Sequence, residues 1–171
     1  MYPTEKFDMI VKLEEQENKN EYNEIMAIEQ VEMELKNHDP LYYIKESEFC
    51  NIFMVELGKD KLKTALKLAN ASLNNSFEIV PIENVVITRQ EKILEQIINT
   101  SKDKIKDGET FSVQCNIIGQ RYIKSKEELL KSIDQEMKNL KINQAKNEPD
   151  WVIHVEVVGE NTGISVLKPH L

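Results

Sequence analysis

The first half of the chain alternates two patterns of hydrophobic and polar residues. Short β-branched runs predict strands, and an apolar residue at every third or fourth position predicts amphipathic helices. The predicted elements are residues 5–14, 20–37, 41–47, 52–57, 60–73 and 78–88. Their order is β-α-β-β-α-β. The first helix is acidic on most of its surface, and its predicted buried side holds Ile25, Ile28, Val31 and Leu35.

That order is typical of ferredoxin-like domains, in which two helices cover one face of an antiparallel sheet. The second helix is expected to begin at a capping Asp60, and its apolar residues keep helical spacing as far as Leu73. We therefore predict an N-terminal ferredoxin-like domain over residues 1–88. A fold of this kind implies no activity by itself.

A second α/β unit is predicted over residues 89–171. Thr88 and Glu91 have the spacing of a capping box and open a helix at about 89–107, which we expect to link the two domains. A second capping box, Ser125 with Glu128, opens another helix. The predicted strands are residues 111–118, 149–158 and 163–169. The fold class is thus α+β, with α/β character in each half.

Charge is unevenly distributed along the chain. The 171 residues include 30 Asp and Glu against 22 Lys and Arg, which gives a formal net charge of −8. Residues 1–88 hold 17 acidic residues against 9 lysines, whereas residues 89–171 hold 13 residues of each sign. Because a polyanion would be repelled by the first half, the neutral second half is the expected platform for one.

The chain shows no sign of export or membrane insertion. It lacks a basic start followed by an apolar stretch, and no window approaches the roughly 20 apolar residues that span a bilayer. Cys50 and Cys115 lie far apart without CxxC spacing, which excludes a disulfide framework and a zinc finger. Both are expected to be small core residues. We expect a soluble, cytoplasmic protein.

Common catalytic and cofactor motifs are missing. The sequence contains no GxGxxG, P-loop, GxSxG or HExxH motif, and its 5 glycines leave few loops to cradle a phosphate. We expect no cofactor, no metal and no catalytic activity. His154 and Glu156, two residues apart on one predicted strand, are an alternative acid–base pair. A polar pair on a partly solvated sheet face is the simpler interpretation.

Positive charge gathers at one strand-to-helix turn. Arg121, Lys124 and Lys126 lie there, next to the outward N–H groups of the helix start, and Tyr122 adds a ring that can stack on a base. This combination is typical of phosphate and RNA binding. Glu127 and Glu128 beside it leave open an ordinary solvated turn. Weaker clusters of lysines lie at Lys102, Lys104 and Lys106, and at Lys138, Lys141 and Lys146.

Several motifs after residue 77 resemble the THUMP domain, an RNA-binding module of tRNA thiouridine synthetases, tRNA methyltransferases and pseudouridine synthases. The matching positions are Phe111, Val113, Arg121, Ser125, Asn147, Pro149, Asp150, Val155 to Val157 and Ile164 to Val166. Two departures are Glu148, inserted between Asn147 and Pro149, and Asn143-Gln144 in place of the usual Asp-Leu. The loop before Pro149 is therefore expected to be reshaped.

The resemblance is narrower to THUMP proteins of archaea and eukaryotes that assist tRNA cytidine acetylation. It implies a non-catalytic adaptor that presents tRNA, through its acceptor region and 3′ end, to a separate tRNA cytidine acetyltransferase that forms N4-acetylcytidine. No catalytic domain follows the matching region, which favours a separate enzyme; DNA and membranes have no expected role. The predicted RNA-binding residues are Arg121, Tyr122, Lys124, Ser125, Lys126, Lys141 and Lys146.

Another interpretation makes the chain a protein-interaction module of a tRNA-modification complex, with little RNA affinity of its own. The acidic helix at 20–37 would then bind a basic enzyme surface, and the enzyme would hold most of the RNA. Salt dependence distinguishes the two, because an RNA site built on Lys and Arg loses affinity steeply as salt rises.

Overall fold

The computed structural model describes residues 3–13, 21–38, 41–71 and 77–169 and has an α+β fold. Its contacts divide the chain into two compact units. The N-terminal unit is residues 6–82, and the C-terminal unit is residues 83–171 together with the first residues up to Glu5. The division falls between Ile82 and Glu83, a few residues before the predicted boundary at 88, and each unit is described separately below.

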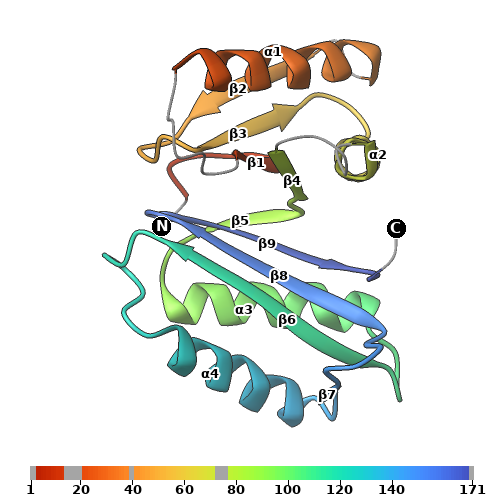
Figure 1. The fold of residues 1–171 in the computed structure, drawn as a ribbon. Coiled ribbons are helices and arrows are strands. Elements are labelled where there is room, and N and C mark those ends of the chain that lie inside the picture. Colours follow the sequence, from red (N-terminus) through yellow and green to blue (C-terminus); the bar gives the residue numbers. More distant parts are fainter. Residues whose placement is uncertain (1–2, 14–20, 39–40, 72–76, 170–171) are drawn as a thin grey trace. The chain divides into compact units, whose positions relative to one another are not determined.

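The N-terminal unit has the predicted β-α-β-β-α-β order. Its elements are β1 (Met9–Leu13), α1 (Glu21–His38), β2 (Tyr42–Glu46), β3 (Ile52–Leu57), α2 (Lys61–Ala71) and β4 (Phe77–Pro81). The sheet order is β2-β3-β1-β4, and every neighbouring pair is antiparallel. Val31 and Leu35 of α1 and Leu68 of α2 share one core with Met9 and Val11 of β1, so both helices cover the same face (Figure 1).

The buried face of α1 differs from the prediction at one position. Ala27, Val31 and Leu35 are buried at i, i+4, i+8 spacing, but Ile25 is 54% exposed. The helix is rotated so that the small Ala27 contacts the sheet, which turns Ile25 toward solvent. Cys50, predicted to be a core residue, is also exposed, because it lies in the turn between β2 and β3. The predicted core residue Leu73 lies outside the described residues.

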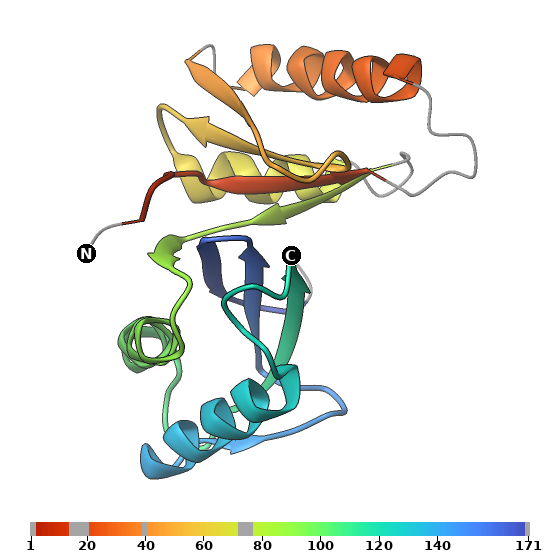
Figure 2. The same cartoon turned by 90° about the vertical axis from the view of Figure 1, so that its left-hand side faces the viewer.

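The C-terminal unit contains a mixed sheet. Its elements are β5 (Asn84–Ile87), α3 (Gln90–Lys104), β6 (Thr110–Ile118), α4 (Lys126–Asn139), β7 (Asn143–Gln144), β8 (Trp151–Val158) and β9 (Asn161–Leu167). The strand order is β5-β9-β8-β6-β7, with β6 parallel to both β7 and β8 and the other pairs antiparallel. Both helices pack on the same side of this sheet (Figure 1 and Figure 2).

The strand predicted at 78–88 is in fact two strands in different sheets. The N–H of Ile82 still donates to Asp8 O, whereas the N–H of Glu83 donates to Ile164 O. The chain therefore leaves one sheet and enters the other within one peptide unit. The Glu83 carboxylate fixes this point, because Glu83 Oε1 accepts from Val166 N at 2.8 Å and pairs with the Lys104 ammonium.

The helix predicted as a linker is an integral layer of the C-terminal unit. Ile93 and Ile97 of α3 are fully buried in the same core as Leu129 and Ile133 of α4. The helix α3 is therefore part of the C-terminal unit and not a connection between domains. Its predicted capping box is also wrong. The N-cap is Arg89, without a side-chain hydrogen bond to the helix. The hydroxyl of Thr88 instead lies 2.8 Å from the hydroxyl of Thr162 on β9.

The N-terminal residues of the chain add to the edge of the C-terminal unit. The backbone N–H groups of Thr4 and Glu5 both donate to Asn161 Oδ1, at 3.0 and 3.2 Å. The Thr4 hydroxyl donates to Glu160 Oε1 at 2.8 Å. These bonds hold the loop between β8 and β9.

Candidate nucleic-acid interface

The turn between β6 and α4 is built to display its polar residues. β6 ends at Ile118, and Gly119 turns the chain with φ +82, a left-handed conformation that favours glycine. Ile123 is buried and anchors the middle of the turn to the core, while Arg121, Tyr122 and Lys124 on either side of it are exposed. We call residues 120–126 the basic turn. It presents cations to solvent on a backbone fixed at both ends and in the middle.

Ser125 of the basic turn is the N-cap of α4, as predicted. Its Oγ accepts from the backbone N–H of Glu128 at 3.2 Å. Its hydroxyl is thus engaged in capping, and a contact with RNA would use the proton that the same hydroxyl can still donate. Glu127 and Glu128 lie in the first turn of α4, where their negative charges interact favourably with the positive end of the helix dipole.

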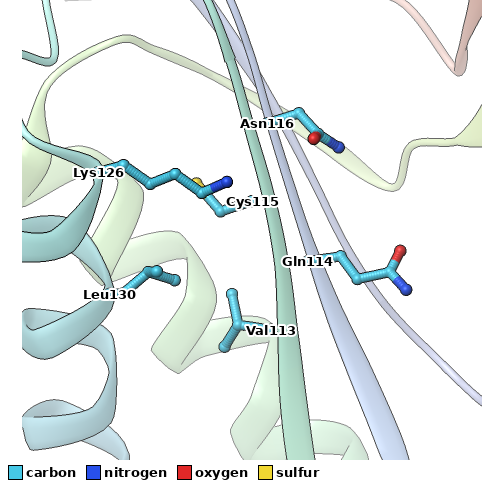
Figure 3. A pocket seen from close by; sticks show the side chains of 6 residues that line it. All are labelled: Val113, Gln114, Cys115, Asn116, Lys126 and Leu130. Carbon is cyan, nitrogen blue, oxygen red and sulfur yellow. The ribbon is translucent and has the colours of Figure 1, made fainter.

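Lys126 faces a hollow separate from the rest of the basic turn. The hollow, of about 390 Å³, lies between the start of α4 and β6 (Figure 3). Lys126 and Leu130 line its helix side and Val113 and Cys115 its strand side, whereas Gln114 points to the other side of β6. Burial raises the pKa of the Cys115 thiol, and the nearby Lys126 charge only partly opposes this. Cys115 is therefore a neutral core thiol, as predicted, rather than a reactive one.

Arg121 and Tyr122 line a second pocket, of about 420 Å³, together with residues from the start of α3. The Arg121 guanidinium carbon lies 5.7 Å from the centre of the Tyr122 ring, within cation–π range. The other lining residues are Ile87, Thr88, Arg89, Gln90, Glu91 and Glu160. We call this the arginine pocket. Sequence reasoning missed Arg89, although the chain has only two arginines and both lie between a strand and a helix.

The cations of the basic turn form no ion pair with an acidic residue that the structure describes. Within the part of the chain that the structure describes, the ion pairs of the C-terminal unit use Lys92, Lys104, Lys138 and Lys168. None of these pairs includes Arg89 or a cation of the basic turn. The charges of Arg121, Lys124 and Lys126 are thus available to an external anion.

The structure separates Lys141 and Lys146 from the basic turn. α4 begins at Lys126 and ends at Asn139, and at 1.5 Å per residue a helix of this length spans roughly 20 Å. Lys141 has φ +62 directly after the C-cap, and Ile142 N donates to Met137 O while Lys141 N donates to Lys138 O. These bonds form a Schellman motif. An RNA contact by Lys141 or Lys146 stays a prediction, and it would require a ligand that follows the whole helix.

The loop after β7 contains the inserted Glu148, and the reshaping expected from this insertion stays a prediction. Glu148 has φ +51, in the left-handed region. The Oδ2 of Asp150 accepts from the backbone N–H of Thr110 at 2.7 Å and from the Thr110 hydroxyl at 3.1 Å. Asp150 is thus a structural residue that joins the start of β8 to β6.

His154 and Glu156 occupy the sheet face opposite the helices. Glu156 is 1% exposed, and its Oε1 accepts from the Asn116 amide of β6 at 2.9 Å. His154 stands opposite Gln114 of β6 and Ser165 of β9 in the strand register. The cross-strand polar neighbours agree with the simpler interpretation, but Glu156 is buried, so its position is not the partly solvated one that was predicted.

The described residues offer neither a metal site nor a membrane-spanning helix. Within residues 3–13, 21–38, 41–71 and 77–169, no group of three or more His, Cys, Asp or Glu side chains could hold a metal ion. Among the described helices, none combines the length and the apolar character needed to cross a membrane.

The C-terminal half matches a known domain family. Residues 88–167 fit the family model of the THUMP domain, so the chain contains a THUMP domain that includes the basic turn and Arg89. A sequence search of curated proteins found no match.

Solved structures share the fold of nearly the whole described chain. The crystal structure of PH1313 from Pyrococcus horikoshii Ot3 aligns with a TM-score of 0.70 at 16% identity and covers 94% of this chain and 55% of its own. A 4-thiouridine synthetase in complex with RNA and ATP gives 0.60 at 17%, covering 95% and 42%. TrmN from Thermus thermophilus gives 0.56 at 13%, covering 92% and 45%. This chain therefore spans about half the length of the chains whose fold it shares.

Proposed function

We propose that this chain binds tRNA as part of a tRNA-modification system, with the basic turn as the main contact. The observation that carries the proposal is a set of exposed cations that have no acidic partner among the described residues and lie on a fixed turn inside a THUMP domain. A structural neighbour at low identity is a 4-thiouridine synthetase–RNA complex, which supports the same class of ligand. Phosphate contacts of this kind position a tRNA by its shape rather than by its base sequence.

We further propose that the chain acts as an adaptor, without catalysing the reaction itself. In this proposal it presents the acceptor region and 3′ end of the tRNA to a separate cytidine acetyltransferase, which forms N4-acetylcytidine. The motif resemblance and the match at residues 88–167 support this assignment. Binding of the same tRNA by two linked proteins lets a weak contact act through its effective concentration.

A second candidate function is a protein-interaction module with little RNA affinity. Its support is the surface of α1, on which Ile25, Met26 and Met33 are 54%, 50% and 69% exposed. Exposed methionines on a helix are adaptable contacts for a partner, and the acidic residues of α1 favour a basic one.

The test is a fluorescence anisotropy titration of the protein with total tRNA at low and near-physiological salt. The variant Arg121→Ala/Lys124→Ala/Lys126→Ala is expected to lose at least tenfold in affinity for tRNA. The slope of log binding constant against log salt concentration should fall in magnitude by roughly two to three. Lys36→Ala/Lys63→Ala/Lys67→Ala is the matched control, because it removes three exposed lysines of the N-terminal unit. It should bind nearly as the wild type does.

Reconstitution with a tRNA cytidine acetyltransferase tests the adaptor role. The yield of N4-acetylcytidine should rise when the wild-type chain is added and should rise less with the basic-turn variant. An equal loss of tRNA affinity in both triple variants would mean that binding depends on the net charge of the protein and not on the basic turn. Absence of tRNA binding by the wild type, even at low salt, would reject the tRNA proposal and favour the interaction module.

A further inference from the structure

The strand β6 has an open edge over most of its length. On one side it pairs with β8 along residues 111–118, whereas on the other side the short β7 pairs only with Thr110 and Phe111. After Ala145, whose N–H donates to Phe111 O, the chain bends away from this edge. No strand that the structure describes lies beside residues 112–118 on that side.

Two hydrogen bonds at the ends of β6 show where its backbone groups point. Phe111 O accepts on the β7 side, and Ile118 O accepts from the residue that follows β8. Because the direction of N–H and C=O alternates along a strand, Val113, Cys115 and Ile117 direct theirs toward the open edge. An added strand would satisfy these groups, as it does in peptide recognition by β-augmentation.

The open edge lacks the features that usually keep edge strands from pairing. Residues 110–118 include no charged residue and no proline. The edge strands of the N-terminal sheet differ, because β2 carries Lys45 and Glu46 and β4 ends at Pro81. The edge of β6 is therefore chemically suited to pairing with another chain.

The hollow beside α4 follows this edge. Val113 and Cys115 line it from the helix-facing side of β6, whereas Gln114 and Asn116 line it from the opposite face (Figure 3). Since β8 occupies the other edge of β6, a hollow lined from both faces extends across the open edge. A chain lying along the edge would place alternate side chains on the helix-facing side of the hollow.

Helix α4 adds the groups that select a ligand. Leu130 supplies an apolar wall, and Lys126 is exposed and takes part in no ion pair within the described ranges. Lys126 also disfavours pairing between two copies of this chain. Antiparallel pairing centred on Cys115 would bring two Lys126 ammonium groups together, because Lys126 and Cys115 line the same hollow. A segment that carries a carboxylate complements this charge instead.

We propose that the open edge of β6 binds an extended acidic segment of a partner protein as an additional strand. The backbone of that segment pairs with Val113, Cys115 and Ile117. Its apolar side chains pack on Leu130, and a carboxylate pairs with Lys126. This inference goes beyond RNA binding and does not depend on it.

The probe is a labelled peptide, Thr-Val-Thr-Glu-Thr-Val-Thr, compared with a second peptide in which lysine replaces the central glutamate. In an extended chain the glutamate and both valines share one face, and the side-chain pattern is the same in both directions. The probe therefore suits parallel and antiparallel addition alike. In anisotropy titrations of the full chain, the glutamate peptide should bind about three to five times more tightly than the lysine peptide.

A charge reversal tests the role of Lys126. Lys126→Glu should reverse the preference between the two peptides, and an acidic residue in the first turn of a helix is compatible with folding. Lys131→Glu is the matched control, because it makes the same change at an exposed position of the same helix outside the hollow. It should keep the wild-type preference, and circular dichroism melts check that both variants remain folded.

Hydrogen exchange followed by NMR tests the backbone contact. The glutamate peptide should slow exchange of the amide protons of Val113, Cys115 and Ile117 at least about fivefold. The amide protons of Gln114 and Asn116 point toward β8 and should change little. This alternation is specific to a strand added at the open edge.

Three results would overturn the proposal. The first is equal binding of the two peptides by the wild type, or an unchanged preference in Lys126→Glu. The second is protection of the same amides by tRNA and not by the glutamate peptide, which would assign the hollow to the RNA surface. The third is protection that rises with protein concentration in the absence of peptide, which would assign the edge to a second copy of this chain.

Discussion

The two units differ more in what they expose than in how they are built. Each is a sheet with two helices on one face, and each has a continuous apolar core. The N-terminal unit holds 15 acidic residues against 9 lysines and exposes five large hydrophobic side chains among its described residues. The C-terminal unit holds both arginines and exposes Tyr122. Similar architectures thus carry different surfaces, one acidic with exposed apolar side chains and one with both arginines and an exposed ring.

The largest expected effect comes from opening a cavity in either core. Ile133→Ala in α4 and Leu35→Ala in α1 each remove a fully buried side chain, and each should cost about 2–5 kcal/mol of stability. If RNA binding belongs to the C-terminal unit, Ile133→Ala should abolish tRNA binding at the temperature where this unit melts. Leu35→Ala should leave tRNA affinity within about twofold at a temperature where the C-terminal unit stays folded. Thermal melts combined with anisotropy measure both, and loss of binding in both variants would contradict the division.

A smaller effect separates the structural role of Lys141 from its predicted RNA contact. Because Lys141 occupies the left-handed position of a Schellman motif, Lys141→Gly should stabilise the protein by about 0.5–1 kcal/mol. Lys131→Gly, in the middle of the same helix, should destabilise it by about 1 kcal/mol. Chemical denaturation measures both values. A more stable Lys141→Gly protein with reduced tRNA affinity would support an RNA contact, and unchanged affinity would remove Lys141 from the site.

The smallest effects concern how protein stability depends on pH when one carboxyl group of each unit is replaced. Burial raises the pKa of Asp8, although its Oδ2 accepts from Leu57 N at 2.8 Å. The folded state then disfavours its charge, so Asp8→Asn should stabilise the protein at pH 7, and this gain should shrink as pH falls toward 4.

Glu109 shows the opposite shift. A hydrogen bond from the backbone N–H of Lys106, followed by one from the Trp151 indole, lowers the pKa of its carboxyl. The Glu109 carboxylate stabilises the folded state at pH values above its pKa in the unfolded chain. This stabilisation is lost as the pH falls through its pKa in the folded protein. Glu109→Gln should therefore destabilise the protein at pH 7, and this loss should also shrink at low pH. Denaturation curves between pH 3 and pH 7 measure both differences, and effects of the same sign would contradict the assignment.

The spacing of apolar residues predicted the helices and strands well where residues of a single element determine which side chains are buried. The β-α-β-β-α-β order, the Ser125 cap and the inward Cys115 all follow from spacing within one element. The break between β4 and β5 could not be predicted this way. Both strands are apolar and nearly continuous in sequence, and the partner that separates them is β9, far along the chain.

The candidate site was predictable in part for the same reason. Arg121, Tyr122 and Lys124 are neighbours in sequence, so one turn brings them together. Arg89 reaches the arginine pocket only because α3 packs beside α4 on the sheet, a tertiary arrangement that a local pattern does not encode. The exposure of Ile25 likewise depends on how α1 is rotated against its sheet.

The bonds of Thr4 have a consequence for the order in which the chain folds. Thr4 and Asn161 are 157 positions apart in the sequence. The strands β5 and β9, which pair with each other, are the first and last strands of the C-terminal unit. Contacts of such long separation form late, because loop closure must precede them. During synthesis the N-terminal unit has all of its strands once Pro81 has left the ribosome, whereas the C-terminal unit must wait for β9. The surface assigned to RNA is therefore completed only after β9 has been made, later than the N-terminal unit.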